Sequence, residues 1–180
     1  MKKLKNEELN RLSPEEFKDT EKIPAVLVLD DVRSAMNVGS AFRTSDAFCL
    51  EKIYLCGITA QPPHREINKT ALGAQDSVEW EHKETIVDCI ADLKKNGYAV
   101  IAVEQADKST SLLDFSIDKE AKYAFVFGNE VFGVSDHVVE TADIVLEIPQ
   151  YGTKHSLNIS VSIGVVLWDY VSKLRTMIST

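Results

Sequence analysis

Three segments of the chain carry amide, hydroxyl and guanidinium side chains at spacings that could serve chemistry. They span residues 30–43, 127–135 and 148–158, and their notable members are Asn37, Gly39, Arg43, Gly128, Asn129, Glu130, Gly152, Ser156 and Asn158. Such groups can orient a polar substrate, and a planar guanidinium suits a phosphate. Each segment follows an apolar run. If those runs are parallel strands, the segments meet at the carboxyl edge of a sheet, where ligands bind.

Each of these residues also has a structural interpretation. Asn37 can cap a helix that begins there, and Gly39 can let that helix pack closely. Ser156 can cap the last helix, with Asn158 in its first turn. Arg43 follows Asn37 by nearly two turns, which would bring both toward the same side of the helix. Taken one at a time, these residues are explained more simply by structure than by chemistry.

The pattern along the chain predicts an α/β fold. Continuous apolar runs at 25–29, 52–56, 98–103, 123–127 and 144–148, with a weaker one at 77–80, are typical of strands in a parallel sheet. Helical patterns lie between them, at 37–48, 84–96, 135–141 and 156–175. This alternation favours a mostly parallel sheet with helices on both faces. Residues 1–22 form a short helical extension with a helix start at Ser13, and 23–180 form one domain.

Composition narrows the functional classes. The 180 residues carry 28 acidic and 20 basic side chains, a net charge of -8, with 44% hydrophobic residues. This argues against disorder and against a scaffold that coats nucleic acid by bulk charge, although a local basic site remains compatible. The three cysteines, Cys49, Cys56 and Cys89, fit small buried hydrophobes. We expect a cytoplasmic protein without a membrane span, a signal peptide or a metal site.

In combination, the motifs resemble a known family. Asn37-x-Gly39-x-x-x-Arg43, then Phe127-Gly128-Asn129-Glu130-x-x-Gly133-x-Ser135, then Ile148-Pro149-x-x-Gly152-x-x-x-Ser156-Leu157-Asn158 resemble the three motifs of the SpoU (TrmH-type) RNA ribose methyltransferases. Order and spacing agree over about residues 25–172, and 70–74 matches a further segment. The resemblance implies methyl transfer from S-adenosylmethionine to a ribose 2′-hydroxyl of transfer or ribosomal RNA. It also implies a C-terminal trefoil knot and a homodimer with shared active sites, neither of which the patterns themselves predict.

The resemblance also implies roles for individual residues. A catalytic group comprises Arg43, Asn37, Glu130, Ser156 and Asn158, and a cofactor pocket comprises Val103, Glu104, Gly128, Ile148, Ser156 and Leu157. Arg43 is expected to orient the phosphate and hydroxyl, because its high pKa makes a neutral guanidinium scarce. Glu130 is expected to pair with or position Arg43, and Asn37 and Asn158 to hold neighbouring backbone and Arg43 in place. Basic residues on or beside these loops are expected to bind RNA: Arg33, Arg43, Arg65, Lys69 and Lys154.

Two alternatives stay open. A catalytically silent knotted protein could keep the RNA or cofactor site, although the intact motif residues count against it. An unrelated nucleotide-dependent enzyme is disfavoured because neither GxGxxG nor GxxxxGK[ST] occurs in the chain. A stripe on the last helix, formed by Leu157, Val161, Val165, Trp168 and Ser172, fits either a dimer contact or a buried face of the monomer.

Overall fold

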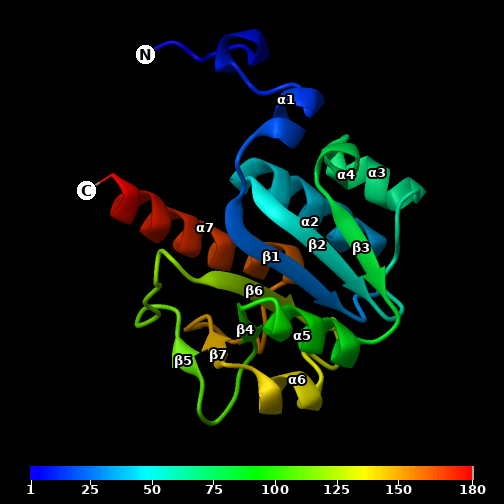
Figure 1. The fold of residues 1–180 in the computed structure, drawn as a ribbon, viewed down its shortest axis with the longest axis vertical. Helices are drawn as coiled ribbons and strands as arrows, with labels where there is room; N and C mark the ends of the chain where they lie inside the picture. Colours follow the sequence, from blue (N-terminus) through cyan, green and yellow to red (C-terminus); the bar gives the residue numbers. More distant parts are fainter. Residues whose placement is uncertain (180) are drawn as a thin grey trace.

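A seven-stranded parallel sheet forms the centre of the molecule. The computed structural model describes residues 1–179, and the strand order is β3-β2-β1-β6-β4-β7-β5 (Figure 1). All the strand pairings are parallel. The strands are β1 (Ile23–Asp30), β2 (Leu50–Cys56), β3 (Trp80–Lys83), β4 (Tyr98–Val103), β5 (Thr110–Ser111), β6 (Lys122–Phe127) and β7 (Ile144–Glu147). The predicted α/β class and parallel sheet are confirmed.

Strand β1 illustrates why the runs are apolar throughout. Its side chains alternate, so Leu27 and Leu29 enter one core while Val26 and Val28 enter another, and all four are at most 1% exposed. A strand covered on both faces needs apolar residues at every position.

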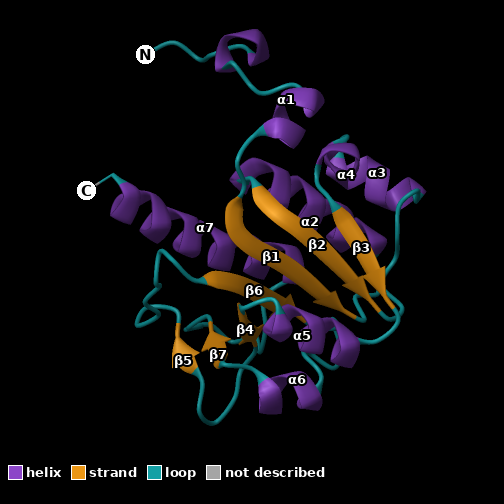
Figure 2. Cartoon of the chain, viewed as in Figure 1, coloured by secondary structure: helices purple, strands orange, loops and turns teal. Residues whose placement is uncertain are grey.

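Helices cover both faces (Figure 2). Helices α2 (Ala35–Phe48), α3 (Arg65–Ala71) and α7 (Ile159–Ile178) contribute to the core that contains Leu27. Helices α5 (Ile86–Lys95) and α6 (Asp136–Thr141) contribute to the other core. The remaining helices are η1 (Asn6–Leu9), α1 (Pro14–Asp19) and α4 (Ala74–Ser77).

The N-terminal helix begins where the sequence predicts. Ser13 caps α1 by accepting a hydrogen bond from the Glu16 N–H, and the Glu16 carboxylate accepts the Ser13 N–H in return. Phe17 is 6% exposed and belongs to the same core as α2 and α7, so α1 is anchored to the sheet by one aromatic side chain.

Several predicted boundaries and caps were wrong. Ser34, not Asn37, caps α2, because the Ser34 hydroxyl accepts the Asn37 N–H at 3.3 Å. Asn158, not Ser156, caps α7 and accepts the Ser160 N–H at 2.8 Å. The strand predicted at 77–80 starts only at its last residue, since Ser77 ends α4 and residues 78–79 connect the helix to the strand. Helix α3 and strand β5 were not predicted.

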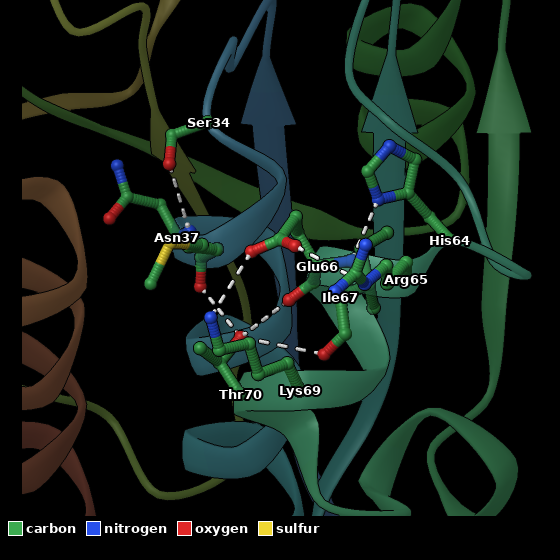
Figure 3. A network of polar contacts seen from close by, with 9 residues as sticks. Ser34, Asn37, His64, Arg65, Glu66, Ile67, Lys69 and Thr70 are labelled. Carbon is green, nitrogen blue, oxygen red and sulfur yellow. Dashed lines mark hydrogen bonds and ion pairs between the residues drawn. The ribbon is translucent and has the colours of Figure 1, made fainter.

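Helices α2 and α3 pack unusually closely. A Cβ atom on Gly39 would lie 2.1 Å from Thr70 Oγ1 and 2.4 Å from the Ile67 carbonyl oxygen. The Thr70 hydroxyl lies between the helices and donates to the Met36 carbonyl at 2.9 Å (Figure 3). Gly39 and Thr70, both part of the sequence pattern, therefore serve this helix contact.

Four neighbouring strands bring the segments of interest together. Strands β1, β6, β4 and β7 lie side by side, and each is followed at its carboxyl end by one of the segments 31–34, 128–135, 104–109 and 148–158. In residues 1–179 no helix is long and apolar enough to cross a membrane.

Gly39→Ala tests the helix contact. Because the Thr70 hydroxyl and the Ile67 carbonyl must move, we expect the free energy of unfolding to fall by about 1–3 kcal/mol in urea titrations. The matched control is Gly164→Ala in α7, where an added Cβ meets nothing within 4 Å. That control should leave stability unchanged or raise it by up to about 1 kcal/mol. Equal stabilities for the two variants would contradict the close packing.

Candidate functional site

A cleft of about 730 Å³ opens at the carboxyl edge of the sheet. Its walls come from the segments that follow β4, β6 and β7 and from the start of α7. The cleft brings together every residue expected to bind a cofactor: Val103, Glu104, Gly128, Ile148, Ser156 and Leu157. Glu130 and Asn158 line it as well.

The Glu130 carboxylate ties the second motif to the first. Its two oxygens accept the backbone N–H groups of Arg33 and Ser34, at 2.9 and 3.0 Å. The Asn37 side-chain amide donates to Oε1 at 2.9 Å. The two backbone donors lie in the loop after β1, just before α2, and the side-chain donor lies in the first turn of α2.

Asn37 also connects this group to the third motif. The Asn158 side-chain amide donates to Asn37 Oδ1 at 3.4 Å, while Asn158 Oδ1 caps α7. A chain of hydrogen bonds therefore runs from Asn158 through Asn37 to Glu130, and it joins residues from all three motifs at the rim of the cleft.

The loop after β6 is held by its own amides. Asn129 Oδ1 accepts the N–H groups of Val131 and Phe132 at 2.9 and 3.2 Å, and Asn129 Nδ2 donates to the Asp31 carbonyl at 2.7 Å. Asn129 and Gly133 exchange two backbone hydrogen bonds. The signal for this turn was in the sequence, since asparagine side chains favour bonds to N–H groups two residues onward.

Gly128 lies where this loop packs against itself. An added Cβ would lie 2.1 Å from the Gly133 carbonyl group and from the Val134 nitrogen. The glycine is therefore required by the tight return of the loop, and the loop in turn forms a wall of the cleft.

Glu104 and Gln105 join the remaining walls. The Glu104 carboxylate accepts the Val134 N–H at 2.9 Å and the Gln105 N–H at 2.8 Å. The Gln105 side chain donates to the His155 carbonyl at 2.7 Å. Gln105, absent from the sequence expectations, thus links the loop after β4 to the loop after β7.

Arg43 lies apart from Glu130. Within the described residues Glu130 does not pair with Arg43, because its carboxylate binds the Arg33 and Ser34 N–H groups and the Asn37 amide. Asn158 holds the neighbouring Ser160 N–H, as expected, but neither Asn37 nor Asn158 bonds to Arg43. Six helical residues turn through about 240° beyond one full turn, so Asn37 and Arg43 point in different directions. Within residues 1–179 the exposed Arg43 guanidinium has no hydrogen-bond or ion-pair partner.

The other expected RNA-binding residues are all exposed. Arg65 and Lys69 approach Glu66 at 4.0 and 3.7 Å on helix α3, in the group drawn in Figure 3. Exposed pairs of this kind contribute little stability, so both cations remain available to a phosphate. The Arg33 side chain and Lys154 have no partner in the described part of the chain.

A sequence model of the SpoU rRNA Methylase family matches residues 24–168. The chain belongs to this family. It is 29% identical over 148 residues to the tRNA (guanosine(18)-2′-O)-methyltransferase of Borreliella burgdorferi, covering 82% of this chain and 66% of that protein. The chain thus spans slightly less than two thirds of this relative's length.

Solved structures of the SpoU type share the fold. The A. aeolicus TrmH/SpoU tRNA modifying enzyme superposes with a TM-score of 0.79 and 25% identity, over 91% of this chain and 81% of that one. An AdoMet-bound rRNA methyltransferase from Sinorhizobium meliloti gives a TM-score of 0.78 and 27% identity, over 91% and 62% of the two chains.

The sequence motifs did not identify every residue of the SpoU cleft. Further lining residues are Gln105, Val131, Phe132, Asp136, Val139 and Gln150. They occupy variable positions of the motif loops or lie beside them, where the resemblance assigns no role. Among residues 1–179 no group of three or more His, Cys, Asp or Glu side chains is arranged to hold a metal ion.

The contribution of the Glu130 carboxyl to stability depends on pH. Its partial burial raises the pKa, but hydrogen bonds from the Arg33 and Ser34 N–H groups and the Asn37 amide outweigh burial, so the pKa lies below the ordinary 4.5. A lowered pKa contributes stability above the unfolded value that is lost as pH falls through the folded value. Glu130 therefore stabilises the fold at neutral pH and loses this effect in acid below about 4.5.

Glu130→Gln tests this network. The amide cannot accept on both sides, so we expect the variant to unfold at lower urea concentration than wild type at pH 7, by about 1–3 kcal/mol. The difference should shrink as pH falls below the ordinary glutamate pKa. Glu120→Gln, at an exposed position outside the cleft, is the control and should show no such difference. A stability difference between wild type and Glu130→Gln that does not change with pH would show that the charge of the Glu130 carboxylate does not stabilise the network.

Proposed function

We propose that the chain transfers a methyl group from S-adenosylmethionine to a ribose 2′-hydroxyl of transfer or ribosomal RNA. The observation that carries the proposal is the chain of hydrogen bonds from Asn158 through Asn37 to Glu130, at the rim of the cleft. The named relatives support it, since the Borreliella protein acts on guanosine 18 of tRNA and the Sinorhizobium protein is an rRNA methyltransferase. Several classes of RNA are thus compatible with the family.

The residues of the cleft fit the cofactor. Its volume of about 730 Å³ lies within the range of roughly 300–1,000 Å³ typical of small-molecule sites. Apolar side chains of Val103, Ile148 and Leu157 suit an adenine ring, and Gln105, Gln150 and Ser156 offer polar groups. S-adenosylmethionine, when bound, supplies a methyl group that is already activated on a sulfonium and leaves a neutral thioether.

The protein's task is then alignment and proton removal. The ribose oxygen must approach in line with the methyl group, and holding both reactants in this geometry supplies much of the rate. Arg43 has no partner in residues 1–179, and its fork of donors fits a phosphate beside the target ribose. Ser156, in the exposed loop before α7, adds a hydroxyl close to the same rim.

A trefoil knot at the C-terminal end is part of the proposal. Strand β7 lies between β4 and β5, so the chain after β7 must return past the segment 104–121 to reach α7. The segment 104–121 makes hydrogen bonds with the returning chain at two places. Gln105 donates to the His155 carbonyl, and the Lys173 ammonium donates to the Phe115 carbonyl at 2.6 Å. Passage of residues 148–179 through this loop would tie the knot.

A homodimer is the second structural part. The stripe Leu157, Val161, Val165 and Trp168 is 38–62% exposed, so it is not the buried face of the monomer core. Trp168 lies 6.1 Å from the Phe48 ring, which extends the apolar surface onto α2. A continuous exposed apolar surface on the helix that begins at the cleft suits a second copy of the chain. A cytoplasmic location, and an extension of residues 1–22 ahead of the methyltransferase domain, complete the proposal.

Arg43→Ala tests the activity. Wild type should transfer tritium from labelled S-adenosylmethionine to RNA from a strain lacking the gene, whereas the variant should lose at least about 100-fold of that rate. Both proteins should bind S-adenosylmethionine equally in calorimetry, with dissociation constants of micromolar order.

Arg175→Ala, in the last turn of α7, is the matched control and should keep full activity. Full turnover by Arg43→Ala would remove Arg43 from the mechanism. A wild type that binds the cofactor but methylates neither transfer nor ribosomal RNA would favour the silent module instead.

Trp168→Glu tests the dimer. A charge in an apolar interface is desolvated without a partner, so sedimentation should shift from dimer to monomer at micromolar concentration. Leu113→Glu is the control, since Leu113 is 76% exposed, lies outside the cleft and is not part of the α7 stripe. A monomeric wild type, or a dimeric Trp168→Glu variant, would contradict the proposed interface.

A further inference from the structure

Phe132 stands out among the residues of the cleft that the motifs leave without a role. It lies at the tip of the loop between Gly128 and Gly133, and it is 84% exposed. The residue lines the main cleft and also a second cavity of about 360 Å³ beside it. An aromatic ring thus lies in solvent at the border between the two hollows.

The fold does not need this ring. The backbone N–H groups of Val131 and Phe132 are satisfied by Asn129 Oδ1, and the Gly133 N–H by the Asn129 carbonyl. The Asn129 amide fixes the loop to Asp31. The loop is therefore held by polar contacts that do not involve the Phe132 side chain, and it presents the ring in a defined position.

Acidic residues beside the Phe132 ring restrict which part of a ligand can cover the ring. The second cavity is lined by Asp30, Asp31 and Asp136 as well as Phe132. Burial raises the pKa of Asp30, whereas Asp136 is exposed and has no side-chain partner in residues 1–179. Carboxylates repel phosphates but accept hydrogen bonds from the N–H edges of nucleobases. An RNA strand approaching here would present a base, not its backbone.

We propose that Phe132 is a specificity-determining residue that stacks on an unpaired base of the RNA, next to the nucleotide whose ribose enters the cleft. The inference rests on the proposed function and adds the part of the substrate that it engages. Unpaired bases stack on aromatic side chains in sequence-specific RNA recognition. The second motif leaves the position of Phe132 unspecified, as x in Glu130-x-x-Gly133, and another side chain there would leave the loop's backbone hydrogen bonds intact.

The test compares four variants with wild type: Phe132→Ala, Phe132→Leu, Phe132→Trp and the control Leu113→Ala. The probes are end-labelled transfer RNA and ribosomal RNA fractions from a strain lacking the gene, with dissociation constants measured by filter binding. Stacking of one base on a ring predicts a loss of about 10- to 100-fold for the Ala and Leu variants. The Trp variant and Leu113→Ala should keep the wild-type affinity.

Three further measurements separate stacking from other roles. The slope of log affinity against log salt should stay at the wild-type value in Phe132→Ala, because a neutral ring releases no counterions, whereas Arg33→Ala should lower it by about one. Sedimentation and calorimetry should give an unchanged oligomeric state and an unchanged affinity for S-adenosylmethionine. Tryptophan fluorescence of Phe132→Trp should be quenched by RNA more strongly than that of wild type.

The outcomes decide the two proposals separately. Wild-type affinity in Phe132→Ala or Phe132→Leu, or a variant that becomes monomeric, would overturn the stacking assignment while methyl transfer by wild type still upheld the enzyme. RNA binding that depends on the ring, with no methyl transfer by wild type, would overturn the proposed activity and leave the assignment intact. A wild type that neither binds nor methylates these RNAs would overturn both.

Discussion

The site depends on one carboxylate satisfying N–H groups from a distant part of the chain. The loop after β1 presents the Arg33 and Ser34 N–H groups, and the first turn of α2 presents the Asn37 side-chain amide. Glu130, nearly a hundred residues later, accepts all three. This is possible because β1 and β6 are neighbouring parallel strands whose carboxyl ends coincide. Once Asn37 is turned toward Glu130, its carbonyl oxygen is left to accept from Asn158, so the start of α7 is positioned by the same group.

This arrangement limits the chemistry that the cleft residues can perform. Both Glu104 and Glu130 already accept N–H groups with their carboxylate oxygens, and these bonds hold the pKa of Glu130 below its usual range. A carboxylate stabilised in its charged form is a weak base. The Glu130 carboxylate is therefore a weak proton acceptor, and the Glu104 carboxylate holds the Val134 and Gln105 N–H groups in place. In the proposed reaction, the Arg43 guanidinium, unpaired in residues 1–179, would orient the substrate, and the activated methyl donor would require geometric alignment.

The sheet could be predicted from the sequence, whereas the hydrogen-bond partners within the site could not. Apolar runs such as 123–127 identify strands because burial on both faces leaves no polar positions. Partner choice inside the site depends on backbone groups that no residue pattern displays. Glu130 looked like a partner for Arg43, yet it binds the N–H groups of Arg33 and Ser34. Asn37 looked like a cap, yet the Ser34 hydroxyl three residues earlier accepts its N–H. Helix α3 lacks a long apolar stripe, and it became visible only through its packing on Gly39.

The acidic and basic residues of the chain are distributed unevenly over its surface. Part of the acid between 79 and 84 is paired at the edge of the sheet, where Lys52 approaches Glu81 at 3.5 Å and Lys83 approaches it at 3.1 Å. Within the motif segments, Arg43 and Lys154 are exposed cations without a partner in residues 1–179. A net charge of -8 weakens the attraction of RNA to the rest of the surface. Under the proposed function, RNA phosphates would meet these cations while the bases would lie against the neutral and acidic parts of the cleft, so recognition would depend on fit rather than on bulk charge.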